Sequence, residues 1–202
     1  MSQFVNDLDA LVDRVASAGR LVAIAGAPAS GKTTLATELA ARIKGAVVVP
    51  MDGFHLDNRV LEPRGLLSRK GSPETFDLGG LKRTLAALKG GGEVVFPVFD
   101  RARDIAVAGA GVCSPDAAPV MVEGNYLLFD EPGWRDLAPF WDLSIRLDVP
   151  IDTLRDRLIQ RWLDLGLDMD LATARAQGND IPNAERIAGA ELPADITYRS
   201  EQ

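Results

Sequence analysis

One short run of residues has the types and spacing needed to hold phosphate, and it matches the pattern G-x-x-x-x-G-K-[ST] in every fixed position. Glycines let the backbone N–H groups surround phosphate oxygens at the positive end of a helix. A lysine adds charge for the outer phosphates, and a threonine hydroxyl is a hard oxygen ligand for Mg²⁺. The run predicts a site for a nucleoside triphosphate with Mg²⁺. Its residues, with the next one along the chain, are Gly26, Ala27, Pro28, Ala29, Ser30, Gly31, Lys32, Thr33 and Thr34.

Two acidic residues lie at the ends of apolar runs that are typical of buried strands. Asp52 follows AVVVPM (46–51), and Glu123 lies near the end of PVMVEG (119–124). Ligands of open α/β sheets bind at the carboxyl ends of the strands. There, Asp52 could accept a proton from an attacking hydroxyl, and Glu123 could hold Mg²⁺ directly or through water. Asp52 followed by Gly53 is equally typical of a plain turn, so spacing alone leaves that alternative open.

Arginines on a later predicted helix, from 151 to about 166, could complete a phosphate site. Arg157 and Arg161 are four residues apart and therefore share a face of that helix. They could close over the phosphates as a lid, Arg157 on the nucleotide and Arg161 on the transferred group. The alternative is a solvated helix face, on which they would pair with Asp152, Asp156 and Asp164.

The elements around the phosphate run predict a parallel sheet. LVAIAG (21–26) reads as a buried strand, a helix follows from Thr34, and 46–51 reads as a second strand. Strand, helix and strand within about thirty residues form a βαβ unit, so the fold class is α/β. Further strands are predicted at 119–124 and 143–149, and ITYR (196–199) closes the chain.

The remaining segments are predicted in outline. An amphipathic first helix is expected from the helical spacing of Phe4, Leu8, Leu11, Val12 and Val15. A long polar loop runs over 52–77, and a helix over 78–89 follows it. The segments 93–99 and 105–109 could pair with each other as a small unit outside the main sheet. A polar stretch leads to Asn183, where another helix begins. The first helix could dock on the core or on a second subunit, which leaves a homodimer open.

Composition limits the partners. The chain has 202 residues, 47% of them hydrophobic and 25% charged, which favours one folded domain over 1–202 with a small lid at about 151–183. A net charge of -7 and a pI near 4.8 argue against binding nucleic acid through bulk charge. They leave small anions open, because a few local donors can hold such a ligand.

Nothing in the sequence predicts export or membrane insertion. No apolar run approaches the roughly 18 residues of a membrane span, and the N-terminus lacks the apolar core of a signal peptide. A single cysteine, Cys113, cannot form an intramolecular disulfide. As a catalytic nucleophile it would need the single histidine, His55, as its base; a small loop residue is the simpler interpretation. These features predict a soluble, cytoplasmic protein.

Taken together, six segments resemble the P-loop kinases grouped around pantothenate kinase, uridine kinase and phosphoribulokinase. The segment 52–77, DGFHLDNRVLEPRGLLSRKGSPETFD, is similar to a pantothenate kinase run of the same layout. The others are GAPASGKT (26–33), PVFDR (97–101), VEGNYLL (122–128), RLIQRW (157–162) and IPNAERI (181–187). The resemblance implies a three-layer α/β/α sandwich with a mostly parallel five-stranded core sheet and a small helical lid.

The same resemblance implies roles for single residues. Asp52 matches the catalytic base of these kinases, and Lys32 and Thr33 match the triphosphate and Mg²⁺ contacts. Glu123 matches the acid after the third strand. Arg161 matches the lid arginine that stabilises the transferring phosphoryl group. Asn183 falls where pantothenate kinase has a substrate-contacting asparagine. ATP is the expected donor, although nothing in the sequence separates it from GTP.

Two differences from pantothenate kinase affect which acceptor is expected. Arg101 stands where pantothenate kinase has a histidine, and Leu158 where it has an aromatic residue. The sequences DGFH (52–55) and EGNYLL (123–128) are similar to those of short bacterial kinases assigned to fructose transport systems. A sugar is therefore the leading expectation, with a nucleoside or pantothenate as alternatives and a nucleotide-dependent switch as a non-enzymatic one. His55 could instead simply cap or pack. The polar side chains expected around the acceptor are His55, Asn58, Asp100, Arg101, Arg103 and Asn125.

Overall fold

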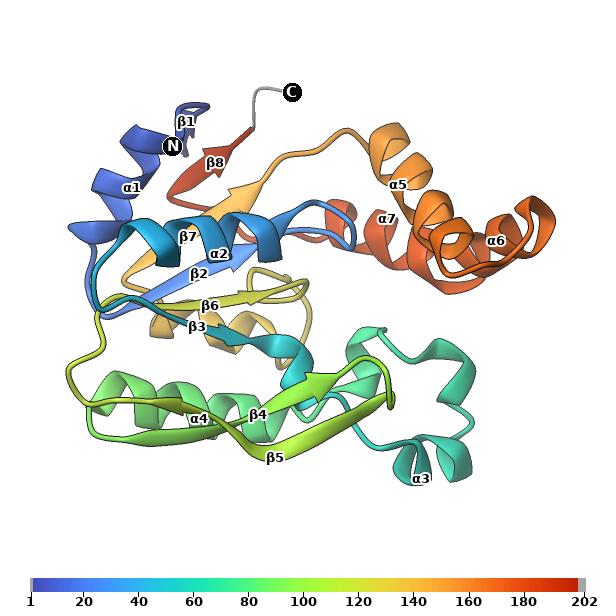
Figure 1. Cartoon of the computed structure of the whole chain (residues 1–202), viewed down its shortest axis with the longest axis horizontal. Coiled ribbons are helices and arrows are strands. Elements are labelled where there is room, and N and C mark those ends of the chain that lie inside the picture. The colour runs from blue at the N-terminus through green and yellow to red at the C-terminus, as the bar shows by residue number, and fades with distance from the viewer. Residues whose placement is uncertain (1, 200–202) are drawn as a thin grey trace.

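The computed structural model describes residues 2–199 and has the predicted α/β architecture (Figure 1). Short helical turns, among them η1 (Met51–Phe54), occupy much of the segment between β3 and α4. The strands are β1 (Gln3–Val5), β2 (Leu21–Ala25), β3 (Val47–Pro50), β4 (Val94–Asp100), β5 (Ile105–Cys113), β6 (Val120–Gly124), β7 (Leu143–Leu147) and β8 (Ile196–Tyr198). The helices are α1 (Leu8–Ala16), α2 (Lys32–Arg42), α3 (Asn58–Leu61), α4 (Leu78–Gly90), α5 (Ile151–Asp164), α6 (Met169–Arg175) and α7 (Ile181–Gly189).

Six strands form one parallel sheet in the order β1-β8-β7-β2-β6-β3. The sheet has one strand more than the family resemblance implies. The extra strand is β1, where the sequence predicts the start of a helix. That prediction is wrong for Phe4, whose side chain is exposed in β1, and the helix begins only at Leu8, after the Asp7 cap. Helical spacing between Phe4 and Leu8 misleads because a three-residue edge strand has too few residues to show its own period.

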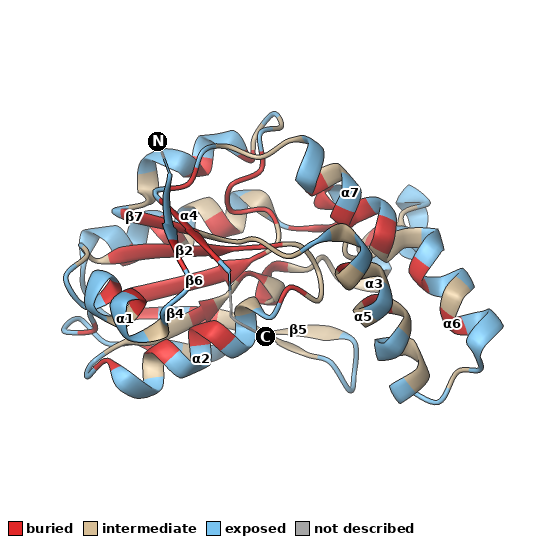
Figure 2. Ribbon diagram, turned by 90° about the horizontal axis from the view of Figure 1, so that it is seen from above, coloured by how far each residue is buried: buried red, intermediate tan, exposed pale blue. Residues whose placement is uncertain are grey.

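Two apolar layers cover the sheet, which makes the predicted sandwich. Along β2, alternate residues face opposite ways, as strand geometry requires. Leu21 and Ala23 belong to the core that includes α4, whereas Val22 and Ile24 belong to the core shared with α1 and α2. Figure 2 shows the buried strands between exposed helix faces. Because β2 is apolar on both faces, it lies in the middle of the sheet.

Two smaller units flank the carboxyl edge of the sheet. As predicted, β4 and β5 pair as an antiparallel hairpin outside the main sheet. Helices α5, α6 and α7 form a lobe with its own apolar cluster, which includes Leu154, Leu158 and Ile181 and packs against Ala27 and Ala29 of the phosphate loop. The polar stretch expected before Asn183 is instead helical, as α6 and a π-helical turn (Ala176–Asp180). The alanines at 172 and 176 are buried, and this small apolar face was too sparse to predict a helix.

Candidate active site

The glycine-rich run forms the loop between β2 and α2. Gly31 caps α2 with a φ of 92°, in the left-handed region that glycine tolerates best. No side chain caps this helix, so its first N–H groups remain open toward the loop. Lys32 is the first helical residue, and its Nζ lies 3.5 Å from the carbonyl oxygen of Ala27. The local geometry is therefore that of an anion-binding helix N-terminus.

Lys32 is half-buried and lies near two carboxylates. Burial lowers the pKa of the Lys32 ammonium, while the charges of Glu123 and Asp52 oppose that shift. Burial likewise raises the pKa of the Glu123 carboxyl, against the effect of Lys32 and of a hydrogen bond with Thr33. A buried charge is costly unless an opposite charge lies nearby, so the charges of Lys32 and Glu123 favour each other. They form a polar cluster behind the loop, at the carboxyl end of β6.

Asp52 lies in η1, directly after β3, and lines the main cavity of the protein. Its carboxylate accepts a 2.6 Å hydrogen bond from the Arg101 guanidinium at the tip of the β4–β5 hairpin. The position is thus a turn that also lines the cavity, and the role of Asp52 as a base stays a prediction. A carboxylate that faces the cavity beside the loop could hold or take a proton there.

Gly53 fixes how closely η1 approaches the hairpin. A Cβ atom at this position would overlap the carbonyl oxygen of Pro97 in β4. We expect Gly53→Ala to lower the free energy of unfolding by about 1–3 kcal/mol, because backbone must move to admit the methyl group. Chemical denaturation measures this change. Gly90→Ala is the control, since nothing lies within 4 Å of a Cβ there; equal effects of the two changes would contradict the close approach.

His55 packs as an aromatic ring and also lines the cavity. The ring lies between Phe76 and Phe99, with centroid distances of 4.1 and 4.6 Å. Its Nδ1 is 2.7 Å from the carbonyl oxygen of Asp52. Burial lowers the pKa of His55, although the Asp52 charge and this hydrogen bond oppose the shift. The ring is therefore neutral at neutral pH.

The neutral ring predicts a pH dependence of stability. Below the ordinary histidine pKa of 6.5, the unfolded chain takes up a proton that the folded ring resists. Stability therefore falls as the pH drops through that value toward the lowered folded pKa. We expect the melting temperature to fall more for the wild type than for His55→Gln between about pH 7.5 and about pH 5.5. His55 is the single histidine, so an equal fall in melting temperature for the wild type and for His55→Gln would contradict the prediction.

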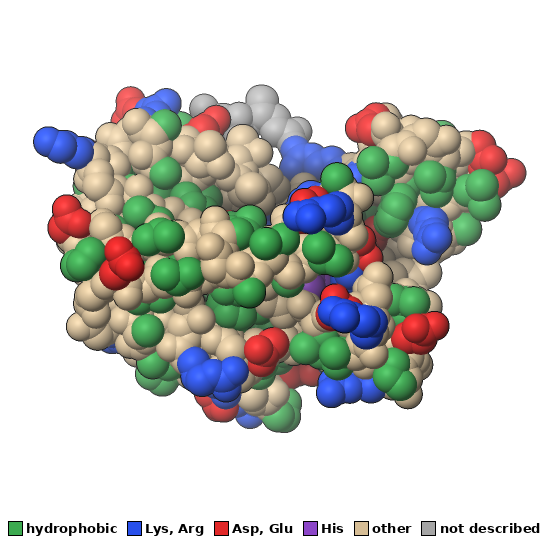
Figure 3. Space-filling view, turned by 60° about the horizontal axis from the view of Figure 1, so that its bottom comes forward, with side chains coloured by type: hydrophobic (Ala, Val, Ile, Leu, Met, Phe, Trp, Pro, Cys, Tyr) green, Lys and Arg blue, Asp and Glu red, His purple; other side chains and the backbone are tan. Residues whose placement is uncertain are grey.

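The main cavity has a volume of about 990 Å³ and lies between the sheet edge, the hairpin tip and the α5–α7 lobe. Figure 3 shows the molecule hollowed between its body and the smaller lobe, with Lys and Arg side chains at the rim. Of the predicted nucleotide residues, the lining includes Pro28, Ala29, Gly31, Lys32, Thr33 and Thr34. Of the predicted catalytic and substrate residues, it includes Asp52, His55, Arg101, Asn125, Arg161 and Asn183.

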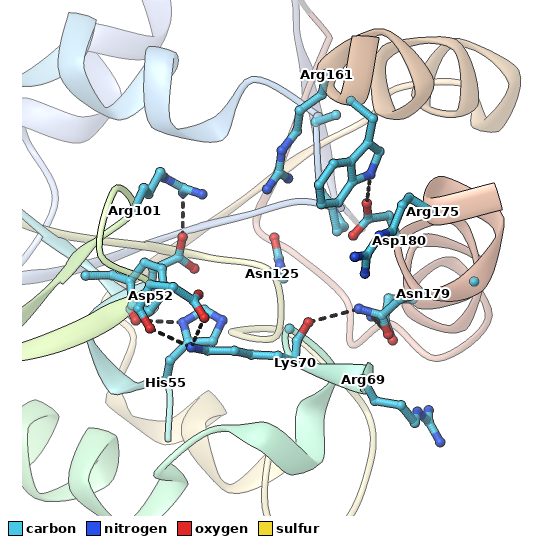
Figure 4. A pocket seen from close by; sticks show the side chains of 18 of the residues that line it. Asp52, His55, Arg69, Lys70, Arg101, Asn125, Arg161, Arg175, Asn179 and Asp180 are labelled. Carbon is cyan, nitrogen blue, oxygen red and sulfur yellow. Dashed lines mark hydrogen bonds and ion pairs between the residues drawn. The ribbon is translucent and has the colours of Figure 1, made fainter. Parts of the chain in front are cut away.

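At the centre of the cavity, Asn125 presents an unsatisfied atom. Its Oδ1 is buried and has no hydrogen-bond partner among residues 2–199. Figure 4 shows Asn125 between Asp52 on one side and the lobe on the other. A buried carbonyl oxygen without a partner costs free energy that a ligand donor can recover. This atom is a place for a hydroxyl or an N–H group.

The two lobe arginines do not pair with Asp152, Asp156 or Asp164, as they would on a solvated helix face. Arg157 donates to the carbonyl oxygen of Ala29 at 3.4 Å, and Arg161 lies 5.7 Å over the Trp162 ring and lines the cavity. Neither makes an ion pair with any residue in 2–199. The acidic Asp152 pairs instead with Arg155, which also binds Glu185.

A second cavity adjoins the other side of the phosphate loop. It has a volume of about 490 Å³ and is open to the same loop through Gly31 and Thr34. Arg157 and Ser30 line it, together with the segment after β7. The phosphate loop therefore lies between two cavities, one of about 990 Å³ and one of about 490 Å³.

Three predicted substrate residues do not line the main cavity. Asp100 and Arg103 pair with each other at 2.7 Å on the hairpin tip. Asn58 accepts a hydrogen bond from Lys70 at 2.7 Å and donates to Asp104 at 3.1 Å. Their polar groups are thus engaged in holding the loop and the hairpin together. Contact with a substrate stays a prediction for these three residues.

Sequence reasoning missed several lining residues. Lys70 binds Asp104 and Asn58 and reaches the cavity from the 52–77 loop. From the lobe come Trp162, Arg175 and Asn179, and Asn179 donates to the carbonyl oxygen of Lys70 at 2.9 Å. A helical pattern over 169–189 would have placed Arg175, Asn179 and Asn183 on one face at intervals of four. This spacing is the sequence signal from which Arg175 and Asn179 could be predicted.

The remaining expectations concern Cys113 and the membrane. Cys113 is buried at the end of β5, in a strand rather than in a loop, and burial raises the pKa of its thiol. A protonated, inaccessible thiol does not serve as a nucleophile. Between Ser2 and Arg199, every helix is too short or too polar to cross a membrane.

Fold and site together define the class of P-loop kinases: a phosphate loop after a central parallel strand, acids at neighbouring strand ends and a cationic helical lobe. Residues 21–170 match the model of the phosphoribulokinase/uridine kinase family. The chain belongs to this family. It is therefore an enzyme that transfers a phosphoryl group to a hydroxyl acceptor.

Three relatives illustrate the similarity. The crystal structure of a protein from Silicibacter sp. TM1040, provisionally assigned as a fructose transport system kinase, is 56% identical, with a TM-score of 0.92 over 96% of this chain and 99% of that one. An uncharacterized Escherichia coli protein, YggC, is 38% identical over 83% of this chain and 72% of its own. A pantothenate kinase from Myxococcus xanthus is 35% identical over 72% of this chain, which spans 50% of that enzyme.

Proposed function

We propose that this enzyme transfers the γ-phosphoryl group of ATP to a hydroxyl of a small polar metabolite, and that the acceptor is a sugar or a sugar derivative. The observation that carries the proposal is the position of Asp52. Its carboxylate faces the main cavity together with the phosphate loop, and Arg101 holds it at 2.6 Å. Donor and acceptor could therefore meet between Lys32 and Asp52.

The donor site follows from the loop. The open N–H groups of α2 and the ammonium of Lys32 would bind the β- and γ-phosphates. The smaller cavity, reached past Ser30 and Arg157, is the space for the base of the nucleotide. Residues Gly26 to Thr34 thus bind the triphosphate, and Arg157 closes one side. ATP and GTP are both compatible with these contacts.

The residues present fit a Mg²⁺ ion. The Thr33 hydroxyl and the Glu123 carboxylate interact with each other and are the hard oxygen ligands that Mg²⁺ takes. Residues 2–199 contain no group of three or more His, Cys, Asp and Glu side chains suited to a metal. A Mg²⁺ ion held by one or two protein oxygens and by phosphate needs no such group. When bound, the ion would neutralise charge on the phosphates.

The chemical step is a displacement at phosphorus. Asp52 orients the acceptor hydroxyl and takes its proton, and the hydroxyl oxygen forms a bond to the γ-phosphorus. The bond from that phosphorus to the β–γ bridging oxygen breaks, and ADP leaves with the electron pair. Lys32 and Arg161 stabilise the charge on the transferring group. Asn125 Oδ1, buried and unsatisfied, accepts a hydrogen bond from another acceptor hydroxyl.

The lobe of α5, α6 and α7 acts as the lid in this proposal. It carries Arg157 and Arg161, and its apolar cluster rests on Ala27 and Ala29 of the phosphate loop. A nucleotide on the loop would therefore contact both the sheet and the lobe. Closure of such a lobe excludes water, which favours transfer to the acceptor over hydrolysis.

A screen of acceptors tests the proposal. We expect ADP release above the acceptor-free rate with at least one polyhydroxylated compound when the enzyme is offered ATP and Mg²⁺. The panel contains fructose and other sugars, sugar phosphates, sugar acids, nucleosides and pantothenate. Preference for uridine or pantothenate would replace the sugar assignment and keep the kinase. Acceptor-independent ADP release with every compound would refute the proposal.

A further inference from the structure

The main cavity is cationic although the protein as a whole carries a net charge of -7. Three acidic side chains line it: Asp52, Asp104 and Asp180. Six cationic side chains line it: Lys32, Arg69, Lys70, Arg101, Arg161 and Arg175. Six less three leaves an excess of three positive charges around one cavity. Such a field concentrates anions at the site.

Three of these six cationic side chains already interact with other groups of the protein. Lys32 belongs to the phosphate loop, and Arg101 is paired with Asp52 at 2.6 Å. The ammonium of Lys70 uses its three donors on the carboxylate of Asp104, the carbonyl oxygen of Asp104 and Oδ1 of Asn58. Lys70 therefore contributes charge to the cavity but has no donor left for a ligand.

The other three cations form no ion pair among the described residues. Arg69 lies in the 52–77 loop, and Figure 4 shows its guanidinium directed away from the other labelled side chains. Arg161 and Arg175 both stack on Trp162, at 5.7 and 5.8 Å from the ring centroid. A cation–π contact with an indole leaves the N–H donors of a guanidinium available.

Arg161 and Arg175 face different parts of the cavity. Figure 4 shows Arg161 opposite Arg101, whereas Arg175 lies beside Asn179 and Asp180. The carboxylate of Asp180 accepts a 2.8 Å hydrogen bond from the Trp162 indole and forms no ion pair with Arg175. Arg175 therefore has no ion-pair partner among the described residues, and it lies next to Asn179, which joins the lobe to the loop at Lys70. The family resemblance gives it no role.

We propose that the acceptor carries an anionic group, a phosphate or a carboxylate, and that Arg175 binds this group. The proposal rests on the phosphotransfer function and narrows its substrate class to a phosphorylated sugar or a sugar acid. Arg175 is exposed at the cavity, and a neutral sugar offers its guanidinium no anionic partner. A carboxylate or phosphate matches the two parallel N–H groups of a guanidinium.

Matched pairs of acceptors test the charge of the substrate. Fructose is compared with fructose 6-phosphate, ribose with ribose 5-phosphate, and glucose with gluconate, in ADP-release assays with ATP and Mg²⁺. We expect at least one anionic member to exceed its neutral partner in kcat/KM by more than about tenfold. The phosphate and carboxylate arms separate the two sources of charge. Equal or higher kcat/KM for the neutral members would overturn the proposal and leave the kinase function intact.

Two variants test the residue. Arg175→Gln should raise the KM of the preferred anionic acceptor more than about tenfold and change kcat little, because its group acts in binding. The KM of the neutral partner should not change. Arg69→Gln removes the same charge from the rim of the same cavity and should leave both values within about twofold. Equal KM effects of the two variants would show a diffuse field and overturn the assignment to Arg175.

A binding measurement keeps the inference testable if no compound is phosphorylated. The same pairs are titrated calorimetrically into wild type and Arg175→Gln, each saturated with Mg²⁺ and a non-hydrolysable ATP analogue. Tighter binding of the anionic members, lost in Arg175→Gln, would support the anion site even if the phosphotransfer proposal failed. Equal affinities for the anionic and neutral members of every pair would overturn the proposed anion site.

Discussion

Asp52→Asn is expected to lower kcat by about 10²- to 10⁴-fold while the affinity for ATP stays nearly unchanged. Asparagine keeps the size of the side chain and can still accept the hydrogen bond from Arg101, but it cannot take the proton of the acceptor hydroxyl. Asp52 faces the cavity across from the phosphate loop, so nucleotide contacts do not depend on its charge. Coupled ADP release gives kcat, and calorimetry gives the Kd of the nucleotide.

Asp57→Asn is the control for this change. Asp57 lies on the same loop and accepts a hydrogen bond from the backbone N–H of Arg59 as the cap of α3, outside the cavity. Asparagine caps helices about as well as aspartate, so this variant should keep both activity and stability. An Asp52→Asn enzyme with near wild-type kcat would show that another group takes the proton.

Lys32→Met is expected to lower kcat by about 10²- to 10³-fold and to weaken nucleotide binding as well. Its ammonium lies at the N-terminus of α2, where it would face the phosphates, and its charge balances that of Glu123. Without it, the buried Glu123 carboxylate loses its nearest compensating charge, and the charge of the transferring group lacks a partner. Both kcat and the Kd of ATP are measured as for Asp52→Asn.

Lys44→Met supplies the comparison. Lys44 is exposed just beyond the end of α2, so the substitution removes the same charge at a distance from the loop. Its kcat and Kd should match those of the wild type. A Lys32→Met enzyme that binds ATP normally would contradict the placement of the triphosphate on this loop.

The parts of the site that are contiguous in sequence were predictable. The phosphate loop occupies consecutive residues between an apolar strand and a helix, so local pattern alone locates it. Asp52 and Glu123 were found because parallel strands end at one edge of a sheet, which brings residues far apart in the chain together. The buried runs at 21–26 and 119–124 made that edge predictable.

The acceptor side of the cavity was harder to predict because tertiary contacts form it. Lys70 belongs to a segment of short turns that has no period, and its place follows from its hydrogen bonds to Asn58 and the hairpin tip. Asp100 and Arg103 have the types expected of ligands, yet the turn of the hairpin lets them satisfy each other. Residue type predicts what a side chain can bind, whereas the backbone decides whether it is free to do so.

The helical lobe shows how sequence pattern can fail locally. Its residues 169–180 are mostly polar or small, and only Ala176 among them belongs to the apolar cluster of the lobe. A helix that buries so little apolar area has a weak periodic signal. The pattern therefore predicts neither Arg175 nor Asn179, whereas helical spacing indicates Arg161 and the family resemblance indicates Arg161 and Asn183 on the same lobe.

The most direct test of the central claim is the fate of the γ-phosphoryl group. The enzyme, ATP, Mg²⁺ and the best acceptor of the screen are incubated, and products are quantified by ³¹P NMR and mass spectrometry. We predict one phosphorylated acceptor for each ADP formed, with this product absent in Asp52→Asn on the same timescale. ADP accompanied only by inorganic phosphate would contradict phosphotransfer and identify the protein as a nucleotide hydrolase or switch.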